Sequence, residues 1–144
     1  MKIITELSRD GNASVPNLSK KLGVNTSVLY SRIKRLVKRK LIERFTIVVN
    51  DRELGYTVKA LTGINMDSKM RDNVIDELMK IPEVREISEV TGRFDIIVTM
   101  YAKNLDEMHR LISERLGRIQ GVQRSESFIE MKRTTKPMPY KPAK

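Results

Sequence analysis

Apolar residues in the first forty positions recur with the spacing of short amphipathic helices. Ile3 and Leu7 fall on one side of a first helix, which we expect to end at the turn-forming residues 10–12. Leu18 and Leu22 lie four residues apart and mark a second helix. The pattern therefore begins with two short helices in close succession.

A very short turn separates the second helix from a third. Ser14 is placed to cap the second helix, and Gly23 is the residue best able to end it in a left-handed conformation. Asn25 is placed to cap the third helix. The apolar stripe of that helix, at i, i+4, i+7 and i+8, is Leu29, Ile33, Leu36 and Val37.

A helix, a glycine turn and a second helix predict a helix-turn-helix, whose second helix enters the DNA major groove. The first-turn residues of that helix are short and polar, which suits base edges, and cations follow where phosphates would lie. A solvated surface helix has the same amphipathy, so the preceding helix and the glycine turn decide for DNA. The candidate DNA-binding residues are Asn25, Thr26, Ser27, Tyr30, Ser31, Lys34, Arg35 and Lys38.

Residues 44–50, with the sequence RFTIVVN, are rich in β-branched and aromatic side chains. We expect them to form a strand beside the third helix, the wing of a winged helix-turn-helix. Gly55 then interrupts the pattern and indicates a domain boundary.

The rest of the chain alternates strand and helix patterns in the order β-α-β-β-α-β. Leu78, Ile81 and Val84 recur 38 positions later as Leu116, Ile119 and Val122, an internal echo of two βαβ halves. The predicted strands are 56–66, 84–90, 95–102 and 122–132, and the predicted helices are 68–81 and 104–119.

These patterns predict an α+β protein: an N-terminal winged helix-turn-helix followed by a ferredoxin-like βαββαβ domain of the RAM type. One strand of the sheet, residues 95–102, is apolar on both sides, so we expect the open sheet face to be hidden by self-association. The expected parts are a DNA-binding domain at 1–50, a linker at 51–56, an oligomerisation and effector domain at 57–132, and a mobile basic tail at 133–144.

Charge is divided unevenly among these parts. Residues 1–50 hold eleven Lys and Arg against three Asp and Glu, a net of +8, whereas residues 51–130 hold twelve against fifteen, a net of −3. The last fourteen residues hold five cations and no acid. A concentrated basic region attracts polyanions, which agrees with double-stranded DNA as a partner.

The sequence offers few residues suited to catalysis or to metal binding. Cys is absent and His109 is the only histidine, which leaves no cluster of metal ligands. Glu86 and Glu89 would point to opposite faces of a strand, and no phosphate-binding glycine loop is present. We therefore expect no enzyme, no metal and no cofactor. No apolar run has the length of a membrane span, and the absence of Cys suits a cytoplasmic protein.

The chain resembles the Lrp/AsnC, or feast/famine, transcriptional regulators of bacteria and archaea. The resemblance rests on LGVNTSVLYSRIKRLVKRKLIERFTIVVNDRELGY, on VTGRFDIIVTM and on the helix ending in IQGV. It implies a promoter-binding N-terminal domain. It also implies a second domain that forms homodimers, often octamers or other higher assemblies, and binds an amino acid or similar effector. Family members usually carry a Leu-Asp-x-x-Asp stretch ahead of the first helix, which this sequence lacks.

The same resemblance places the small-molecule contacts around the TGRFD turn. Amide groups near Gly92 could bind a carboxylate, and Asp95 could pair with an α-amino group, although a plain hairpin turn needs the same residues. Two serines of the partner's last strand could face the same pocket. The candidate effector residues are Thr91, Gly92, Arg93, Phe94, Asp95, Ser125 and Ser127.

Two alternatives use the same patterns. The order βαββαβ is also that of an RRM, which stacks RNA bases on aromatic residues of its central strands. Here residues 84–90 hold no aromatic residue and the last strand holds only Phe128, so that alternative fails. A chromatin-like protein that coats DNA through phosphates alone, with little sequence preference, remains open.

Overall fold

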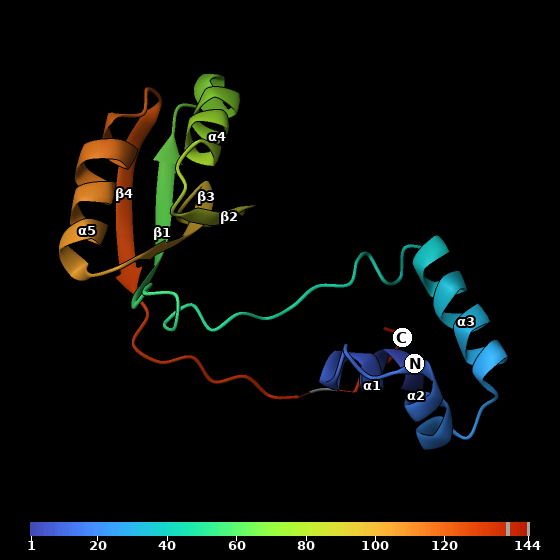
Figure 1. The fold of residues 1–144 in the computed structure, drawn as a ribbon. Coiled ribbons are helices and arrows are strands. Elements are labelled where there is room, and N and C mark those ends of the chain that lie inside the picture. Colours follow the sequence, from blue (N-terminus) through green and yellow to red (C-terminus); the bar gives the residue numbers. More distant parts are fainter. Residues whose placement is uncertain (138, 144) are drawn as a thin grey trace. The chain divides into compact units, whose positions relative to one another are not determined.

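The computed structural model describes residues 1–137 and 139–143 and divides the chain into two compact units (Figure 1). The first unit comprises Met1–Val49 together with Thr134–Lys144, and the second comprises Asn50–Arg133. Among the described residues, none of the helices has the length and apolar character that crossing a bilayer requires.

Three helices form the body of the first unit: α1 (Lys2–Arg9), α2 (Val15–Leu22) and α3 (Thr26–Lys38). This confirms the three helices predicted from the apolar spacing. Their core is small, with three buried side chains surrounded by partly buried ones. The buried residues are Ile3, Leu18 and Leu29, and the partly buried ones are Leu7, Val15, Leu22, Ile33 and Leu36.

The ends of α2 and α3 follow the predicted capping. The Ser14 hydroxyl accepts a hydrogen bond from the Asn17 amide at 3.3 Å, and the Asn25 side chain accepts one from the Ser27 amide at 2.9 Å. Gly23 has φ 66°, the left-handed conformation that ends a helix without the strain a Cβ would cause. These three residues fix the turn between α2 and α3.

Glu6 joins α1 to α2. Its carboxylate lies 2.6 Å from Lys21 Nζ and 3.2 Å from Arg9 Nη1. The hydrogen bond from Lys21 holds the pKa of Glu6 below its ordinary value. A lowered pKa means that this contribution to stability is present at neutral pH and fades as the pH falls through the pKa of the folded state.

The predicted wing strand is not formed. Residues 44–50 have no strand conformation, and Phe45, Ile47 and Val48 are 59%, 81% and 100% exposed. β-branched residues favour an extended chain, but a strand also needs a partner strand to bond with. None of the described residues supplies that partner, so the prediction of a wing was wrong for this chain taken by itself.

The second unit is a four-stranded antiparallel sheet in the order β2-β3-β1-β4. Its chain order, β1-α4-β2-β3-α5-β4, confirms the predicted βαββαβ fold. The strands are β1 (Val58–Met66), β2 (Val84–Glu89), β3 (Ile96–Ala102) and β4 (Val122–Ile129), and the helices are α4 (Arg71–Met79) and α5 (Leu105–Arg110).

The second long helix changes its geometry along its length. Asn104 caps α5 by accepting a hydrogen bond from the Glu107 amide at 2.8 Å, as predicted. The helix then continues as a π-helical turn at Leu111–Arg115 and a 3₁₀ turn at Leu116–Arg118. The predicted helix at 104–119 is therefore helical almost throughout, but only its first part is α-helical.

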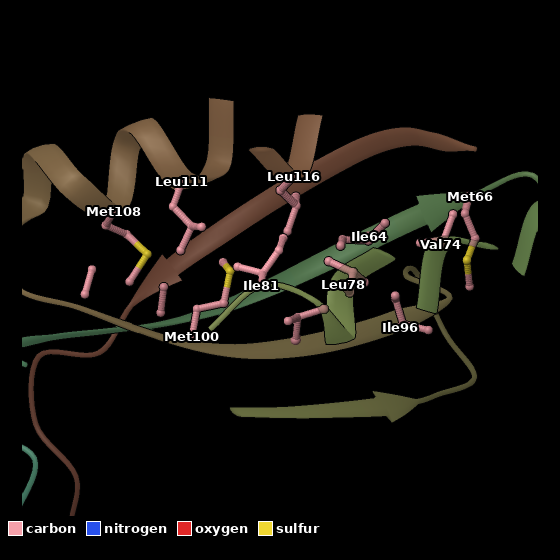
Figure 2. Packing of buried hydrophobic residues seen from close by; sticks show 13 residues of the cluster. Ile64, Met66, Val74, Leu78, Ile81, Ile96, Met100, Met108, Leu111 and Leu116 are labelled. Carbon is pink, nitrogen blue, oxygen red and sulfur yellow. The ribbon is translucent and has the colours of Figure 1, made fainter. Parts of the chain in front are cut away.

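Side chains from the helices and from the middle strands fill one core. Figure 2 shows Met108, Leu111 and Leu116 from the second helix and Val74 and Leu78 from α4, packed against Ile64, Ile96 and Met100 of the strands. Leu78 and Leu116, one matched pair of the internal echo, are both fully buried. The two βαβ halves thus place equivalent residues in the same core.

The chain divides differently from the sequence-based expectation at two places. The expected linker at 51–56 is a turn belonging to the second unit, closed by a bond from the Tyr56 amide to the Asp51 carbonyl and by an ion pair from Arg85 to Asp51. The sequence predicts a mobile tail, whereas Thr134–Lys144 belong to the first compact unit.

The end of α3 provides a stability prediction. Lys40 has φ 58°, a left-handed conformation that glycine adopts without cost, and the chain reverses there through bonds from the Leu41 and Ile42 amides to the Leu36 carbonyl. Lys40→Gly should stabilise the helix-turn-helix by up to about 1 kcal/mol. Amide hydrogen exchange in α3 should then slow by up to about five-fold.

Arg39→Gly is the matched control, because it removes the same charge at a residue with φ −76°. It should speed exchange, since glycine in a right-handed helical conformation only adds freedom to the unfolded chain. Faster exchange in both variants would mean that Lys40 carries no backbone strain.

Candidate DNA-binding surface and effector site

The eight predicted DNA-binding residues lie together on α3 and its cap. All eight are exposed, whereas Leu29, on the opposite side of the helix, is fully buried. Because Leu29 packs with Ile3 and Leu18, the buried stripe turns the polar and basic side away from the three-helix core. The surface consists of Asn25, Thr26, Ser27, Tyr30, Ser31, Lys34, Arg35 and Lys38.

Short polar groups gather at the N-terminus of α3. Asn25 Oδ1 accepts hydrogen bonds from both the amide and the hydroxyl of Ser27, at 2.9 and 2.7 Å. The Ser27 oxygen keeps its lone pairs, so it can still accept a bond from a base amino group. The Asn25 side chain already caps the helix. It therefore suits a structural role better than direct contact with bases.

An aromatic ring and three cations follow along the same side. Tyr30 is 60% exposed, and Lys34 Nζ lies 5.8 Å from the centroid of its ring. Among the described residues, Lys34, Arg35 and Lys38 form no ion pair with an acidic side chain. Their charges are therefore available to a polyanion.

The predicted effector turn is held rigidly by Asp95. Its Oδ2 accepts a hydrogen bond from the Met66 amide at 2.9 Å, and its own amide donates to the Ile64 carbonyl at 3.0 Å. Its carbonyl accepts a bond from the Val90 amide at 3.0 Å. Asp95 thus helps to fix the backbone of the turn, and its role as the partner of an α-amino group stays a prediction.

The other members of the turn lie over the open face of the sheet. The Phe94 ring covers Gly63 so closely that a Cβ on Gly63 would lie 2.4 Å from it. Arg93 stacks on that ring, 5.6 Å from its centroid, and lies 3.4 Å from Glu126 on β4. Thr91 and Gly92 are exposed at the tip of the turn.

Sequence reasoning missed Glu126. Gly63 pairs with Glu126 across β1 and β4, which places both on the face that carries Phe94. One carboxylate oxygen of Glu126, Oε2, is buried; it lies 3.4 Å from Arg93 Nη2 but accepts no hydrogen bond within the part of the chain that the structure describes. The alternation of side chains along the predicted last strand was the signal that could have identified it.

Ser125 and Ser127 lie on the other face of the sheet. Ser127 pairs with the fully buried Thr62, and their hydroxyl oxygens are 2.8 Å apart. Because side chains alternate along a strand, Ser125 shares that face, whereas Glu126 points to the opposite one. Within one subunit, the two serines therefore do not join the effector turn.

The second unit also has a hollow of about 470 Å³, which lies away from the effector turn. Tyr56, Glu83, Lys103, Glu107, Arg110 and Arg115 are among its lining residues, and none of the predicted effector residues is. Within the described part of the chain, no three His, Cys, Asp or Glu side chains come together as metal ligands. His109 is exposed.

Comparison with known families gives two matches that follow one another along the chain. A model described as winged helix-turn-helix DNA-binding matches residues 1–43, and one described as the Lrp/AsnC ligand binding domain matches residues 59–140. The HTH-type transcriptional regulator FL11 of Pyrococcus furiosus is 35% identical over 131 residues, which cover 91% of this chain and 86% of the relative.

Solved structures share the fold. A transcriptional regulator of Neisseria meningitidis in complex with L-Met matches with a TM-score of 0.89 and 19% identity, covering 96% of this chain and 92% of that one. A feast or famine regulatory protein of M. tuberculosis complexed with L-methionine matches with a TM-score of 0.86 and 22% identity, covering 98% and 95%. The α+β arrangement of three helices followed by the four-stranded sheet is common to them.

These matches cover both units in the order in which they occur. The exposed basic surface of α3 lies within the residues that match the DNA-binding model, and the sheet with its TGRFD turn lies within those that match the ligand-binding model. The chain therefore belongs to the Lrp/AsnC family and is a transcriptional regulator with a DNA-binding helix-turn-helix and a ligand-binding domain.

Proposed function

We propose that the chain is an oligomeric regulator that reads a specific DNA sequence through α3 and responds to an amino acid or a related small molecule. One observation carries the DNA half of the proposal. The short polar residues at the start of α3 and the cations further along it share one exposed side, which faces away from the buried Leu29.

That order suits a helix entering the major groove by its N-terminus. Ser27, Tyr30 and Ser31 would meet base edges, where hydroxyl groups can donate or accept hydrogen bonds. Lys34, Arg35 and Lys38 would then meet the phosphates that flank the groove and set the register of the helix. Selectivity thus comes from the first turns, and most of the affinity comes from the cations.

Two exposed apolar regions support a homodimer. Leu61 and Phe128 are neighbours on the open face of the sheet and are 37% and 53% exposed. Residues 44–50 are a second such region. A second copy of the chain would cover both and would present two α3 helices to half-sites one helical turn apart or a multiple of it. Octamers or other higher assemblies would repeat that dimer.

The effector would bind on the open face beside the 91–95 turn. An amino acid needs an anion for its ammonium group and a cation or amide donors for its carboxylate. Glu126 and Arg93, 3.4 Å apart, supply both charges beside the apolar ring of Phe94. The L-methionine complexes of two proteins with this fold make that amino acid the first probe.

The cations of α3 provide the first DNA-binding prediction. Lys34→Ala and Lys38→Ala should each weaken binding to all sequences, because each removes one phosphate contact. The slope of log affinity against log salt should fall by about one for each variant. Fluorescence anisotropy with labelled duplexes at several salt concentrations measures both effects.

Lys69→Ala is the control, because Lys69 is an exposed lysine in the other unit. It should leave the salt slope unchanged. If Lys69→Ala lowered the slope as much as Lys34→Ala does, binding would depend on overall charge and not on α3.

The exposed ring of Tyr30 provides a prediction about sequence preference. Tyr30→Ala should relax selectivity at one base position in each half-site, by about ten-fold, because a lost base contact costs about 1–3 kcal/mol. Competition between the preferred duplex and single-base variants measures that ratio.

Val28→Ala is the matched control, since Val28 is exposed on another side of α3. It should leave the ratio unchanged. A Tyr30→Ala variant with unaltered site preference and unaltered affinity would contradict the placement of α3 in the groove.

The effector proposal assigns the ammonium contact to Glu126. Glu126→Gln should weaken L-methionine binding at least about ten-fold in isothermal titration, because it removes the charge of a partly desolvated acceptor and keeps its shape. Glu130→Gln, four residues further along the chain and just after β4, should leave that affinity within about two-fold of the native value.

The reverse result would restore the sequence-based assignment. In that result, Asp95→Asn would abolish L-methionine binding without disturbing the fold of the sheet, whereas Glu126→Gln would have no effect on binding. Asp95 would then be the ammonium partner. A thermal-shift screen of the twenty amino acids against the native chain would find the effector if it is another amino acid.

A further inference from the structure

The C-terminal segment contacts α1 of the DNA-binding unit. The Tyr140 amide donates a hydrogen bond to Thr5 Oγ1 at 3.0 Å, across 135 positions of sequence. Pro139, Tyr140 and Lys141 also border a hollow of about 410 Å³ whose other walls come from α1 and from the end of α2. Those walls include Met1, Thr5, Glu6, Arg9 and Leu22.

The segment covers a side of α1 that the three-helix core does not use. Ile3 and Leu7 pack toward Leu18 and Leu29. Thr5, with Met1 and Ser8 one turn away on either side, lies on a different side of the helix. That second side is where the described residues of 134–143 border α1.

α1 has few other sources of stability. It is eight residues long, Met1 gives it no side-chain cap, and Ile3 is its only buried residue. An isolated helix of that length is not stable in water, so tertiary contacts must hold it. Its ion pair with Lys21 involves a lysine that is largely exposed, and pairs with an exposed partner contribute little.

The composition of the C-terminal segment, which we call the strap, suits docking on α1. Pro137, Pro139 and Pro142 restrict the backbone before it binds, which lowers the entropy lost on docking. Tyr140 remains 53% exposed, so the contact is shallow and rests on the backbone bond to Thr5 as much as on the ring.

We propose that residues 134–137 and 139–143 are a structural part of the DNA-binding unit: they dock on the outer side of α1 of the same chain and hold that helix in place. The chain then crosses between the two units twice, at residues 49–50 and 133–134. Both connections leave the same end of the sheet, because Lys59 near the start of β1 bonds Glu130 just after β4 (Figure 1).

Docking also changes the charge of the unit that meets DNA. Residues 1–49 carry +8, and the three lysines of 134–144 with no acid raise the unit to +11. A strap that fixes Lys136 and Lys141 beside α1 therefore adds cations to the DNA-binding unit, and this consequence rests on the proposed function.

Hydrogen exchange of the whole chain tests the docking without any DNA. A chain ending at Arg133 should exchange the α1 amides about ten-fold faster than the full chain. The β1 and β3 amides in the same sample should be unchanged, which shows that the second unit still folds. Unchanged exchange of the α1 amides would overturn the proposal. If DNA affinity fell while α1 exchange stayed unchanged, the tail would act only by attracting phosphates and not by holding α1.

A double-mutant cycle isolates the Thr5 contact. Thr5→Val removes the hydroxyl with little change of shape, and it should speed α1 exchange more in the full chain than in the chain ending at Arg133. Thr5→Ser keeps the hydroxyl and should behave as the native residue does in both chains. Equal effects of Thr5→Val in the two chains would overturn the contact.

A disulfide test identifies which chain the strap belongs to, and the absence of native cysteine makes the test clean. The Thr5→Cys, Tyr140→Cys double variant should oxidise to a cross-linked monomer on a non-reducing gel. A cross-linked dimer would overturn the same-chain assignment and make the strap an exchange between subunits.

Discussion

The presentation of α3 to DNA depends on the burial of Leu29. With Ile3 and Leu18 it makes up the entire buried core of the first unit, within the described residues. Truncating such a leucine costs about 2–5 kcal/mol, which is comparable to the whole stability of a domain this small. Because Leu29 faces inward, the residues on the opposite side of α3 must face outward, and these are the polar and basic ones.

The second unit solves a different physical problem, because its core is large enough to be stable without help. Thirteen buried residues fill it, and the central strand β1 bonds to β3 on one side and to β4 on the other. This rigid frame holds the 91–95 turn through Asp95 and presents an open face with Phe94, Arg93 and Glu126. In the proposed function, the unit with the larger core carries the effector residues and the unit with the smaller core carries the DNA contacts.

Local patterns predicted the fold because each element has its own signal. Gly23 and the capping residues Ser14 and Asn25 marked the helix ends, and the echo of Leu78 in Leu116 marked the two βαβ halves. Residues 44–50 were predicted wrongly, because β-propensity does not say whether a partner strand exists. The hydrogen bonds of Asp95 and the sheet face that carries Ser125 and Ser127 depend on pairing between segments 29 or more residues apart, which composition and local spacing do not contain. The effector roles of these three residues stay predictions.

Selection of bound genomic fragments by the full chain, at physiological salt and with excess nonspecific competitor DNA, tests the central claim most directly. We expect enrichment of a short two-fold symmetric site whose halves lie one helical turn apart or a multiple of it. Failure to enrich any sequence, with binding that only weakens as salt rises, would contradict sequence-specific reading by α3. That result would support a protein that coats DNA through its phosphates.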